Sequence, residues 1–183
     1  MSYYLGIFGG VGTNPSAALL KGKKIIAFAE EERFNRIKNA PLALPLNAIF
    51  YCLKKAKISI NRIKEISFGW DCPHQFNIVP KKFKKIYLKH GGLRNRYNLN
   101  LEDRIRLGYD PDKIINEIKW AFAKKEQKFN KKIIYYKHHL SHAASTFYPS
   151  GFKKSSILIL DGMGEEFTGG FYVGNGKNIK CLK

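Results

Sequence analysis

Three apolar segments at the start of the chain are joined by connections too short for anything except neighbouring antiparallel strands. They are residues 3–8, 16–20 and 24–30. A loop rich in Gly, Asn, Pro and Ser separates the first two, and only Lys21-Gly22-Lys23 separates the last two. Parallel strands need a crossover of a dozen or more residues, which neither connection supplies. The chain is therefore predicted to begin with a three-stranded antiparallel meander.

A helix and a fourth strand are predicted to follow the meander. Pro45 stands at the start of the helix, where a missing N–H costs nothing. Its apolar positions share one face, namely Leu46, Ile49, Phe50 and Leu53. Residues 63–69 are the next predicted strand. The resulting order, β-β-β-α-β, indicates an α/β fold with a mixed sheet flanked by helices.

The second half of the chain contains one strongly amphipathic helix and several predicted strands. Asp110 is a suitable helix cap, and Pro111 occupies the first helical position. The buried stripe of this helix is predicted to be Ile114, Ile115, Ile118 and Phe122. Residues 131–137 and 155–161 are predicted strands, and the second is apolar enough to be buried on both faces. The end of the chain is predicted to form a hairpin turning at Asn175-Gly176. No internal repeat is visible.

The net charge of +19 admits three interpretations, namely a nucleic-acid-binding surface, a solvated surface, and an active site for small phosphorylated substrates, which needs only a few of these charges. A basic surface attracts nucleic acid, and residues 81–96 alone carry seven basic side chains. However, 26 of the 33 basic residues are lysine and only seven are arginine, the usual reader of phosphate and guanine. We therefore favour a solvated lysine-rich surface and expect no nucleic-acid partner. A basic nucleic-acid-binding module is the alternative from another functional class.

The location is predicted to be cytoplasmic. No segment reaches the roughly 18 consecutive apolar residues of a membrane span. The first residues lack the basic start and small-residue cleavage site of a signal peptide. Cys52, Cys72 and Cys181 are odd in number and widely spaced, which argues against a disulfide framework and against a cysteine-bound metal.

The segment HHLSHAAS, residues 138–145, contains three of the five histidines. If residues 138–147 are helical, His138 and His142 lie one turn apart on the same face and can share one cation. His139 would point elsewhere, either behind these two or into solvent. Histidine pairs at this spacing also arise by chance, so the pair alone leaves metal binding at about even odds.

Asp161 raises those odds, because it follows the apolar run ILIL. Ligands collect beyond the carboxyl ends of strands in open α/β sheets. Two imidazoles and one carboxylate suit Fe(II), Zn or Mn and leave coordination positions open. Gly162 and Gly164 follow. They are either turn residues or places where a phosphate or nucleotide can approach bare backbone.

Four segments together resemble a known family, the O-carbamoyltransferases of nodulation-factor and antibiotic biosynthesis. They are SAALLKGKKIIAFAEEERFNRIK, PLNAIFYCLKKAKI, HHLSHAASTFYPSGF and ILILDGMGEE. The resemblance implies a ribonuclease H-like lobe of the kind found in actin and sugar kinases. It also implies a divalent metal, most readily iron with zinc or manganese as alternatives, held by His138, His142 and Asp161. Gly162, Gly164 and Glu165 would then contact the nucleotide.

The chemistry implied by the resemblance joins ATP and carbamoyl phosphate to give a carbamoyl-adenylate. The carbamoyl group then passes to a hydroxyl of a sugar or natural product. Residues 1–183 would form part of the first lobe of the metal-containing domain. The second lobe and the C-terminal adenylate-forming domain would lie in a missing part of the same protein or in a separately encoded chain. We therefore expect this chain to be inactive alone.

Three features leave alternatives open. Family members commonly have histidine where this chain has Asn14, which can hydrogen-bond but cannot take a proton at neutral pH. Either the base lies elsewhere, the acceptor chemistry differs, or the protein is degenerate. The shared fold and the charge also allow a tRNA threonylcarbamoyl transferase-like protein. The cluster formed by Glu30, Glu31, Glu32, Arg33 and Arg36 is either solvated surface or partly turned toward the active-site cleft.

Overall fold

The strands of the computed structural model, which describes residues 1–77 and 108–182, form two separate sheets. The five-stranded sheet has the order β3-β2-β1-β4-β5, and the three-stranded sheet has the order β6-β7-β8. The first contains β1 (Tyr3–Phe8), β2 (Ser16–Lys21), β3 (Lys24–Glu30), β4 (Ile63–Phe68) and β5 (Ile133–Tyr135). The second contains β6 (Lys154–Gly164), β7 (Phe167–Asn175) and β8 (Asn178–Cys181).

The five-stranded sheet is mixed, as the order of its elements requires. β1, β2 and β3 form an antiparallel meander, whereas β4 pairs in parallel with both β1 and β5. Gly22 makes the tight turn possible because it adopts a φ of +60°. The predicted α/β fold with a mixed sheet that starts as an antiparallel meander is therefore confirmed.

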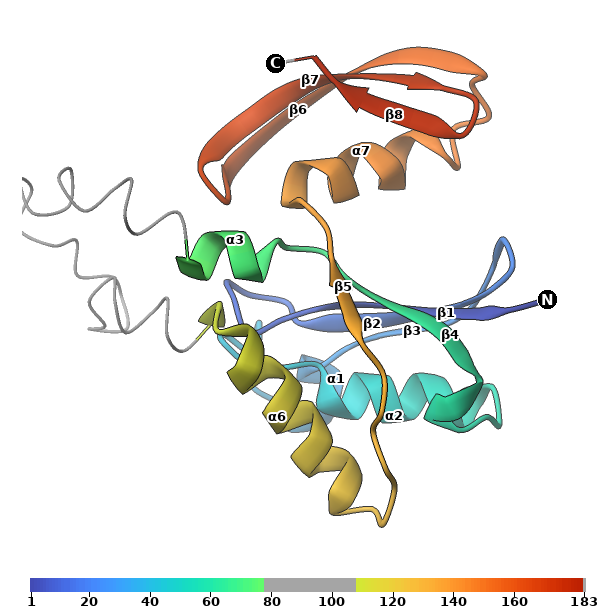
Figure 1. Cartoon of the computed structure of the whole chain (residues 1–183), viewed down its shortest axis with the longest axis vertical. Coiled ribbons are helices and arrows are strands. Elements are labelled where there is room, and N and C mark those ends of the chain that lie inside the picture. Colours follow the sequence, from blue (N-terminus) through green and yellow to red (C-terminus); the bar gives the residue numbers. More distant parts are fainter. Residues whose placement is uncertain (78–107, 183) are drawn as a thin grey trace, which may run out of the picture.

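The helices lie on both sides of the five-stranded sheet (Figure 1). They are α1 (Glu32–Asn35), α2 (Leu46–Lys55), α3 (Cys72–Asn77), α6 (Pro111–Ala123) and α7 (His138–Phe147), with a 3₁₀ turn at Ile60–Arg62. α2 and α6 cover one face of this sheet, and α7 lies on the opposite side, against β6–β8. Among residues 1–77 and 108–182, no helix combines the length and the apolar character needed to cross a membrane.

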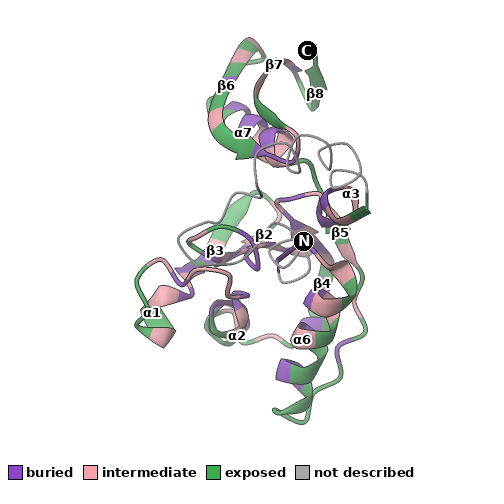
Figure 2. Cartoon of the chain, turned by 90° about the vertical axis from the view of Figure 1, so that its left-hand side faces the viewer, coloured by how far each residue is buried: buried purple, intermediate pink, exposed green. Residues whose placement is uncertain are grey.

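The main core lies between the five-stranded sheet and the helices α2 and α6 (Figure 2). Leu19, Phe68 and Phe122 are completely buried there, and the Phe50 and Phe122 rings pack with centroids 4.7 Å apart. Both predicted helices are confirmed. The Asp110 side chain accepts hydrogen bonds from the second and third amides of α6, at 2.9 and 3.3 Å, as expected of a cap.

A buried carboxylate from outside the helix caps α2. Pro45 stands at the cap position and has no side-chain acceptor. Instead Glu31, only 3% exposed, accepts hydrogen bonds from the backbone N–H groups of Asn47 (3.2 Å) and Ala48 (3.0 Å). These are two of the orphan donors at a helix start. Glu31 is therefore a structural member of its charged cluster.

The second sheet differs from the prediction in two respects. Residues 155–161 were expected to form a fully buried strand, and this is wrong, because Leu158 is 54% and Leu160 is 82% exposed. The reason is that α7 covers one face of a separate antiparallel sheet, so only alternate residues such as Ile159 are buried. The hairpin turn also lies one residue later than predicted, since Asn175 pairs with Asn178.

The second sheet repeats the topology of the first meander. Its turn residues, Gly176-Lys177, match Gly22-Lys23, and the two glycines have φ values of +59° and +60°. Glycine in the first position of a two-residue turn suits the twist of antiparallel strands. The same supersecondary unit therefore occurs twice, although the two sequences share little beyond the turn.

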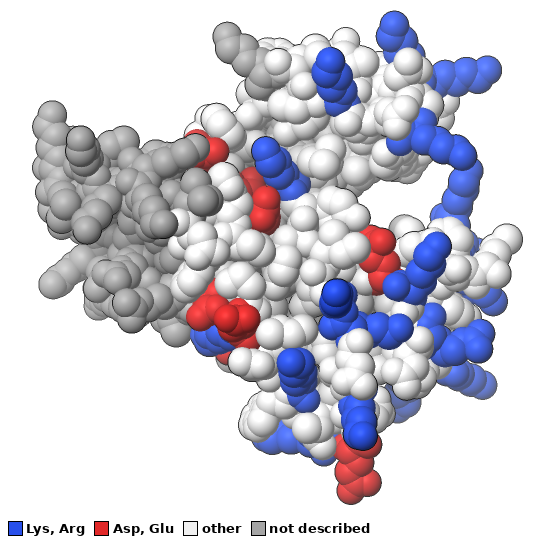
Figure 3. Space-filling view, viewed as in Figure 1, with Lys and Arg blue, Asp and Glu red and all other residues white. Residues whose placement is uncertain are grey.

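Lysine and arginine are spread over much of the face shown in Figure 3, and acidic side chains there are few. The basic side chains lie both over β6–β8 and over the lower part of the molecule, and they are not concentrated on any single element. This distribution is typical of a solvated surface. The basic segment 81–96 lies outside the described residues.

Replacing Glu31 with alanine should lower the free energy of unfolding by about 2 kcal/mol, because two helix amides and the Asn47 side chain lose their buried acceptor. Glu30→Ala is the matched control. Within the described part of the chain its carboxylate pairs with Arg33 alone, whose side chain is 67% exposed, so the change should stay within about 0.5 kcal/mol. Urea unfolding followed by circular dichroism measures both, and equal effects would contradict the capping role.

Candidate metal centre

Helix α7 places two imidazoles together, one turn apart. His138 is its first residue, and His142 follows on the same face. Their Nε2 atoms are 3.0 Å apart, and the rings meet edge to face with centroids at 4.4 Å. The helix prediction for residues 138–147 is confirmed. Its small residues allow close packing, since Ala143 is fully buried against the second sheet.

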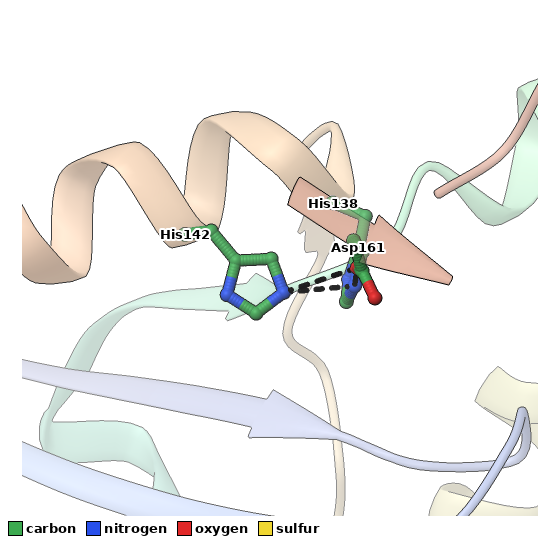
Figure 4. A group of neighbouring side chains, drawn as sticks. All are labelled: His138, His142 and Asp161. Atoms are coloured by element: carbon green, nitrogen blue, oxygen red, sulfur yellow. Dashed lines mark hydrogen bonds and ion pairs between the residues drawn. The ribbon is translucent and has the colours of Figure 1, made fainter. Parts of the chain in front are cut away.

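Asp161 joins the two histidines from strand β6. It lies on the same side of the strand as Ile159, two residues earlier, and Ile159 packs against α7. Its Oδ2 atom is 2.8 Å from Nε2 of His138 and 3.4 Å from Nε2 of His142. Figure 4 shows the three side chains pointing toward one another. The sequence predicts Asp161 to lie at the carboxyl end of a strand in the α/β sheet. The structure places it within β6 of the second sheet instead.

The three side chains fit a divalent cation. One ligand atom from each of His138, His142 and Asp161 lies within 4.8 Å of the others. Two neutral nitrogen donors and one anionic oxygen form the borderline-hard set that Fe(II), Zn and Mn accept. The His142 side chain is 48% exposed, so the cluster opens to solvent on one side. A metal there would keep positions for other ligands.

The His138 ring is held in the tautomer that a metal ligand needs. Its Nδ1 lies 3.2 Å from the carbonyl oxygen of Gly69, which can only accept a hydrogen bond. The proton therefore belongs on Nδ1, and the Nε2 lone pair faces Asp161 and His142. The Trp70 ring packs against the imidazole with centroids 4.5 Å apart and fixes its plane.

The carboxylate of Asp161 is kept ionised by its neighbours. Burial by itself raises the pKa of this group. The Gly162 N–H at 2.6 Å, and after it the nearby imidazoles of His138 and His142, outweigh burial and lower the pKa. The side chain is therefore an anionic ligand throughout the neutral range.

Glu165 lies at the turn that follows the predicted metal ligand. It is 7% exposed and adopts a left-handed φ of +49°. Its carboxylate accepts hydrogen bonds from the backbone N–H groups of Asp71 (2.9 Å) and His138 (3.0 Å). The second contact caps α7, whose own cap residue, Lys137, provides no acceptor. The predicted nucleotide-contacting residue thus also joins the two sheets.

The two glycines of this turn differ in their surroundings. A Cβ atom on Gly162 would have no other atom within 4 Å, so its backbone is open to a ligand. A Cβ atom on Gly164 would lie 2.6 Å from Nε2 of His139. Gly164 is therefore required to be glycine by packing. Whether either glycine contacts a nucleotide stays a prediction.

Asn14 lies in the loop between β1 and β2. It is exposed, has a φ of +60°, and donates its backbone N–H to the carbonyl of Asn39 at 2.8 Å. Asparagine is one of the few residues that tolerate this backbone conformation. The loop begins after Phe8, whose ring centroid is 6.1 Å from that of His138. The catalytic role of Asn14 stays a prediction.

His139 is a residue whose place the sequence left open between a position behind the ligands and solvent. It is 4% exposed, so the solvent alternative is wrong. Its Nε2 atom lies 3.8 Å from Oδ2 of Asp161. Burial, followed by the charge of His138, lowers the pKa of this imidazole. The only signal in the sequence was the doubled histidine together with the glycine three residues after Asp161.

Comparison with known proteins gives one family. The family model described as Carbamoyltransferase N-terminus matches residues 7–182. An uncharacterized protein, sll1178, from Synechocystis sp. is 31% identical over 169 residues, covering 90% of this chain and 26% of the relative. The nodulation protein NolNO from Sinorhizobium fredii is 30% identical over 169 residues, covering 91% of this chain and 22% of the relative. The chain thus spans about a quarter of the length of these relatives.

A solved structure shows a similar fold. The crystal structure of an uncharacterized protein with similarity to peptidase YEAZ from Pseudomonas aeruginosa matches with a TM-score of 0.50 and 14% sequence identity. The match covers all of this chain and 64% of that chain. At this identity the likeness concerns the fold alone.

Replacing Glu165 with alanine should lower the free energy of unfolding by about 2 kcal/mol, because two partly buried N–H groups lose a buried, charged acceptor. Glu165→Gln should cost clearly less, since one amide oxygen can still accept from both donors. Guanidinium unfolding curves of the three proteins measure the difference. Alanine and glutamine variants as stable as the unchanged chain would show that this carboxylate does not hold the turn.

Proposed function

The chain belongs to the carbamoyltransferase N-terminus family, and from this we propose that it supplies the metal-binding part of an O-carbamoyltransferase. The observation that carries the proposal is the convergence of His138, His142 and Asp161 within the region that the family model matches. Because the chain spans about a quarter of its relatives, we assign the activity to a larger assembly. The second lobe and the adenylate-forming domain would come from the same protein or from a separate chain.

The proposed reaction moves a carbamoyl group in two stages. ATP, carbamoyl phosphate and water first give a carbamoyl-adenylate in the adenylate-forming domain, with release of pyrophosphate and phosphate. A hydroxyl oxygen of a sugar or natural product then forms a bond to the carbonyl carbon, its proton passes to a base, and AMP leaves with the electrons of the broken C–O bond. We place the protein in the cytoplasm, where its three free thiols would stay reduced.

His138, His142 and Asp161 would hold the cation, with iron preferred and zinc or manganese as alternatives. When bound, such a metal supplies Lewis-acid polarisation of a substrate oxygen. The imidazole of His138 is held for this purpose by the Gly69 carbonyl, and Asp161 by the Gly162 N–H. The exposed edge at His142 is where the substrate would enter.

The turn after Asp161 would meet the nucleotide. We assign the direct contact to the backbone of Gly162, because the space beside it is open. Gly164 and Glu165 would hold the turn in place. Gly164 already packs against the His139 ring, and Glu165 already accepts hydrogen bonds from two backbone amides. Asn14 would hydrogen-bond the acceptor hydroxyl, and another group would take its proton.

The metal site can be tested on this chain directly. The unchanged chain should bind one Co²⁺ or Fe²⁺ ion, because its three ligand side chains already converge. His142→Ala and Asp161→Asn should each weaken the affinity by more than about 100-fold, beyond what the loss of an outer hydrogen bond costs. Calorimetric titration and elemental analysis measure both. Glu117→Ala, at a partly exposed position of α6, is the control, and metal content unchanged in all variants would rule the site out.

The activity can be tested in the assembly that combines this chain with the second lobe and the adenylate-forming domain. Radiolabelled carbamoyl phosphate, ATP and a panel of hydroxyl compounds should give a labelled ester-like product. Asp161→Asn should lower the rate by about 100-fold or more, because losing several kcal/mol of metal-borne stabilisation has that effect. Label found only on tRNA would support the threonylcarbamoyl alternative instead.

A further inference from the structure

We propose that His139 positions the carboxylate of Asp161 for metal binding, and that Gly164 is glycine because the His139 ring occupies the space of a side chain there. The inference rests on the proposed metal site but assigns a new role to a residue that is not one of the three ligands. It starts from the arrangement of the three imidazoles around one carboxylate oxygen.

All three histidines of α7 direct Nε2 toward Oδ2 of Asp161. The distances are 2.8 Å from His138, 3.4 Å from His142 and 3.8 Å from His139. As metal ligands, His138 and His142 must offer the Nε2 lone pair to the cation and cannot donate a hydrogen bond to the carboxylate. His139 is then the imidazole left to donate to this oxygen.

The burial of His139 supports this role. Its side chain is 5% exposed, and Nε2 has no hydrogen-bond partner among the described residues. A buried polar atom without a partner is rare, so a partner is expected nearby. Asp161 provides it if the 3.8 Å separation shortens to about 3.0 Å, the usual hydrogen-bond length. The other oxygen of this carboxylate already accepts the Gly162 N–H.

Gly164 fixes where the His139 ring lies. An added Cβ at this position would be 2.6 Å from Nε2 and 2.9 Å from both Cδ2 and Cε1 of the ring. The backbone at Gly164 is held in β6 by its pairing with Phe167. The ring therefore rests on strand backbone, three residues beyond Asp161, and cannot turn away from the carboxylate without losing this packing.

The experiment compares Co²⁺ affinity among single variants of the full chain, with Co²⁺ alone as the probe. His139→Leu removes the donor and should weaken the affinity 10- to 100-fold, roughly the range for lost hydrogen bonds to metal ligands. His139→Gln keeps an N–H near the same place and should recover most of that loss. The visible absorption band of bound Co²⁺ should keep its position in both, because the ligands are unchanged. Glu117→Gln, at a partly exposed position of α6 away from the cluster, is the control and should bind as the unchanged chain does.

A second pair of variants tests the role of Gly164. Gly164→Ala should displace the His139 ring and weaken Co²⁺ binding about as much as His139→Leu does. In a His139→Ala background the added methyl group meets no ring, so Gly164→Ala should cause no further loss. This non-additivity is the sign of a shared mechanism, and it gives a result even where His139→Leu fails to fold.

The possible failures are distinguishable. If the unchanged chain binds no Co²⁺, both the proposed metal site and this inference are overturned. If the unchanged chain binds Co²⁺ and His139→Leu binds equally well, only this inference is overturned. A shift of the absorption band in His139→Leu as large as that in His142→Ala would make His139 a ligand and would also overturn it.

Discussion

The arrangement of the site depends on one buried carboxylate, that of Glu165. It binds the N–H of Asp71, just beyond β4, and the N–H of His138, the first residue of α7. A negative charge at a helix start is stabilised by the unpaired amides there. The turn between β6 and β7 is thereby tied to the carboxyl end of the five-stranded sheet. His74 and Glu166, 3.3 Å apart, form a second link beside it. Through these contacts Asp161 is brought to face the histidines.

Much of the fold could be predicted because local chemistry decides it. The short connection at Gly22 permits only a meander, and Asp110 with Pro111 marks the start of α6 unambiguously. The spacing of His138 and His142 was sufficient to place them on one helical face. In each case the interaction that determines the local structure spans only a few residues, and such short-range interactions can be predicted from the local sequence pattern.

The parts that could not be predicted depend on contacts between distant segments. The exposure of Leu158 and Leu160 follows from β6 joining a second sheet, and an apolar run alone does not tell which sheet a strand joins. The sequence indicates for Glu31 only membership of a charged cluster, and for Glu165 only a place at a nucleotide-contacting turn. The structure shows that each is buried against the amides of a helix that lies elsewhere in the chain. The direction of His139 likewise depended on the backbone of Gly164.

The three residues of the candidate metal centre are separated by few positions in the sequence. His138 meets His142 four positions away and Asp161 23 positions away, whereas the link from Glu165 to Asp71 spans 94 positions. Short loops close at a lower entropic cost and earlier in folding than long ones. The ligand cluster can therefore assemble within a single local unit of α7, β6 and β7. Docking of that unit on the larger sheet needs the longer closure between Glu165 and Asp71, and it brings in the Gly69 carbonyl and the Trp70 ring that hold the His138 imidazole in its ligand orientation.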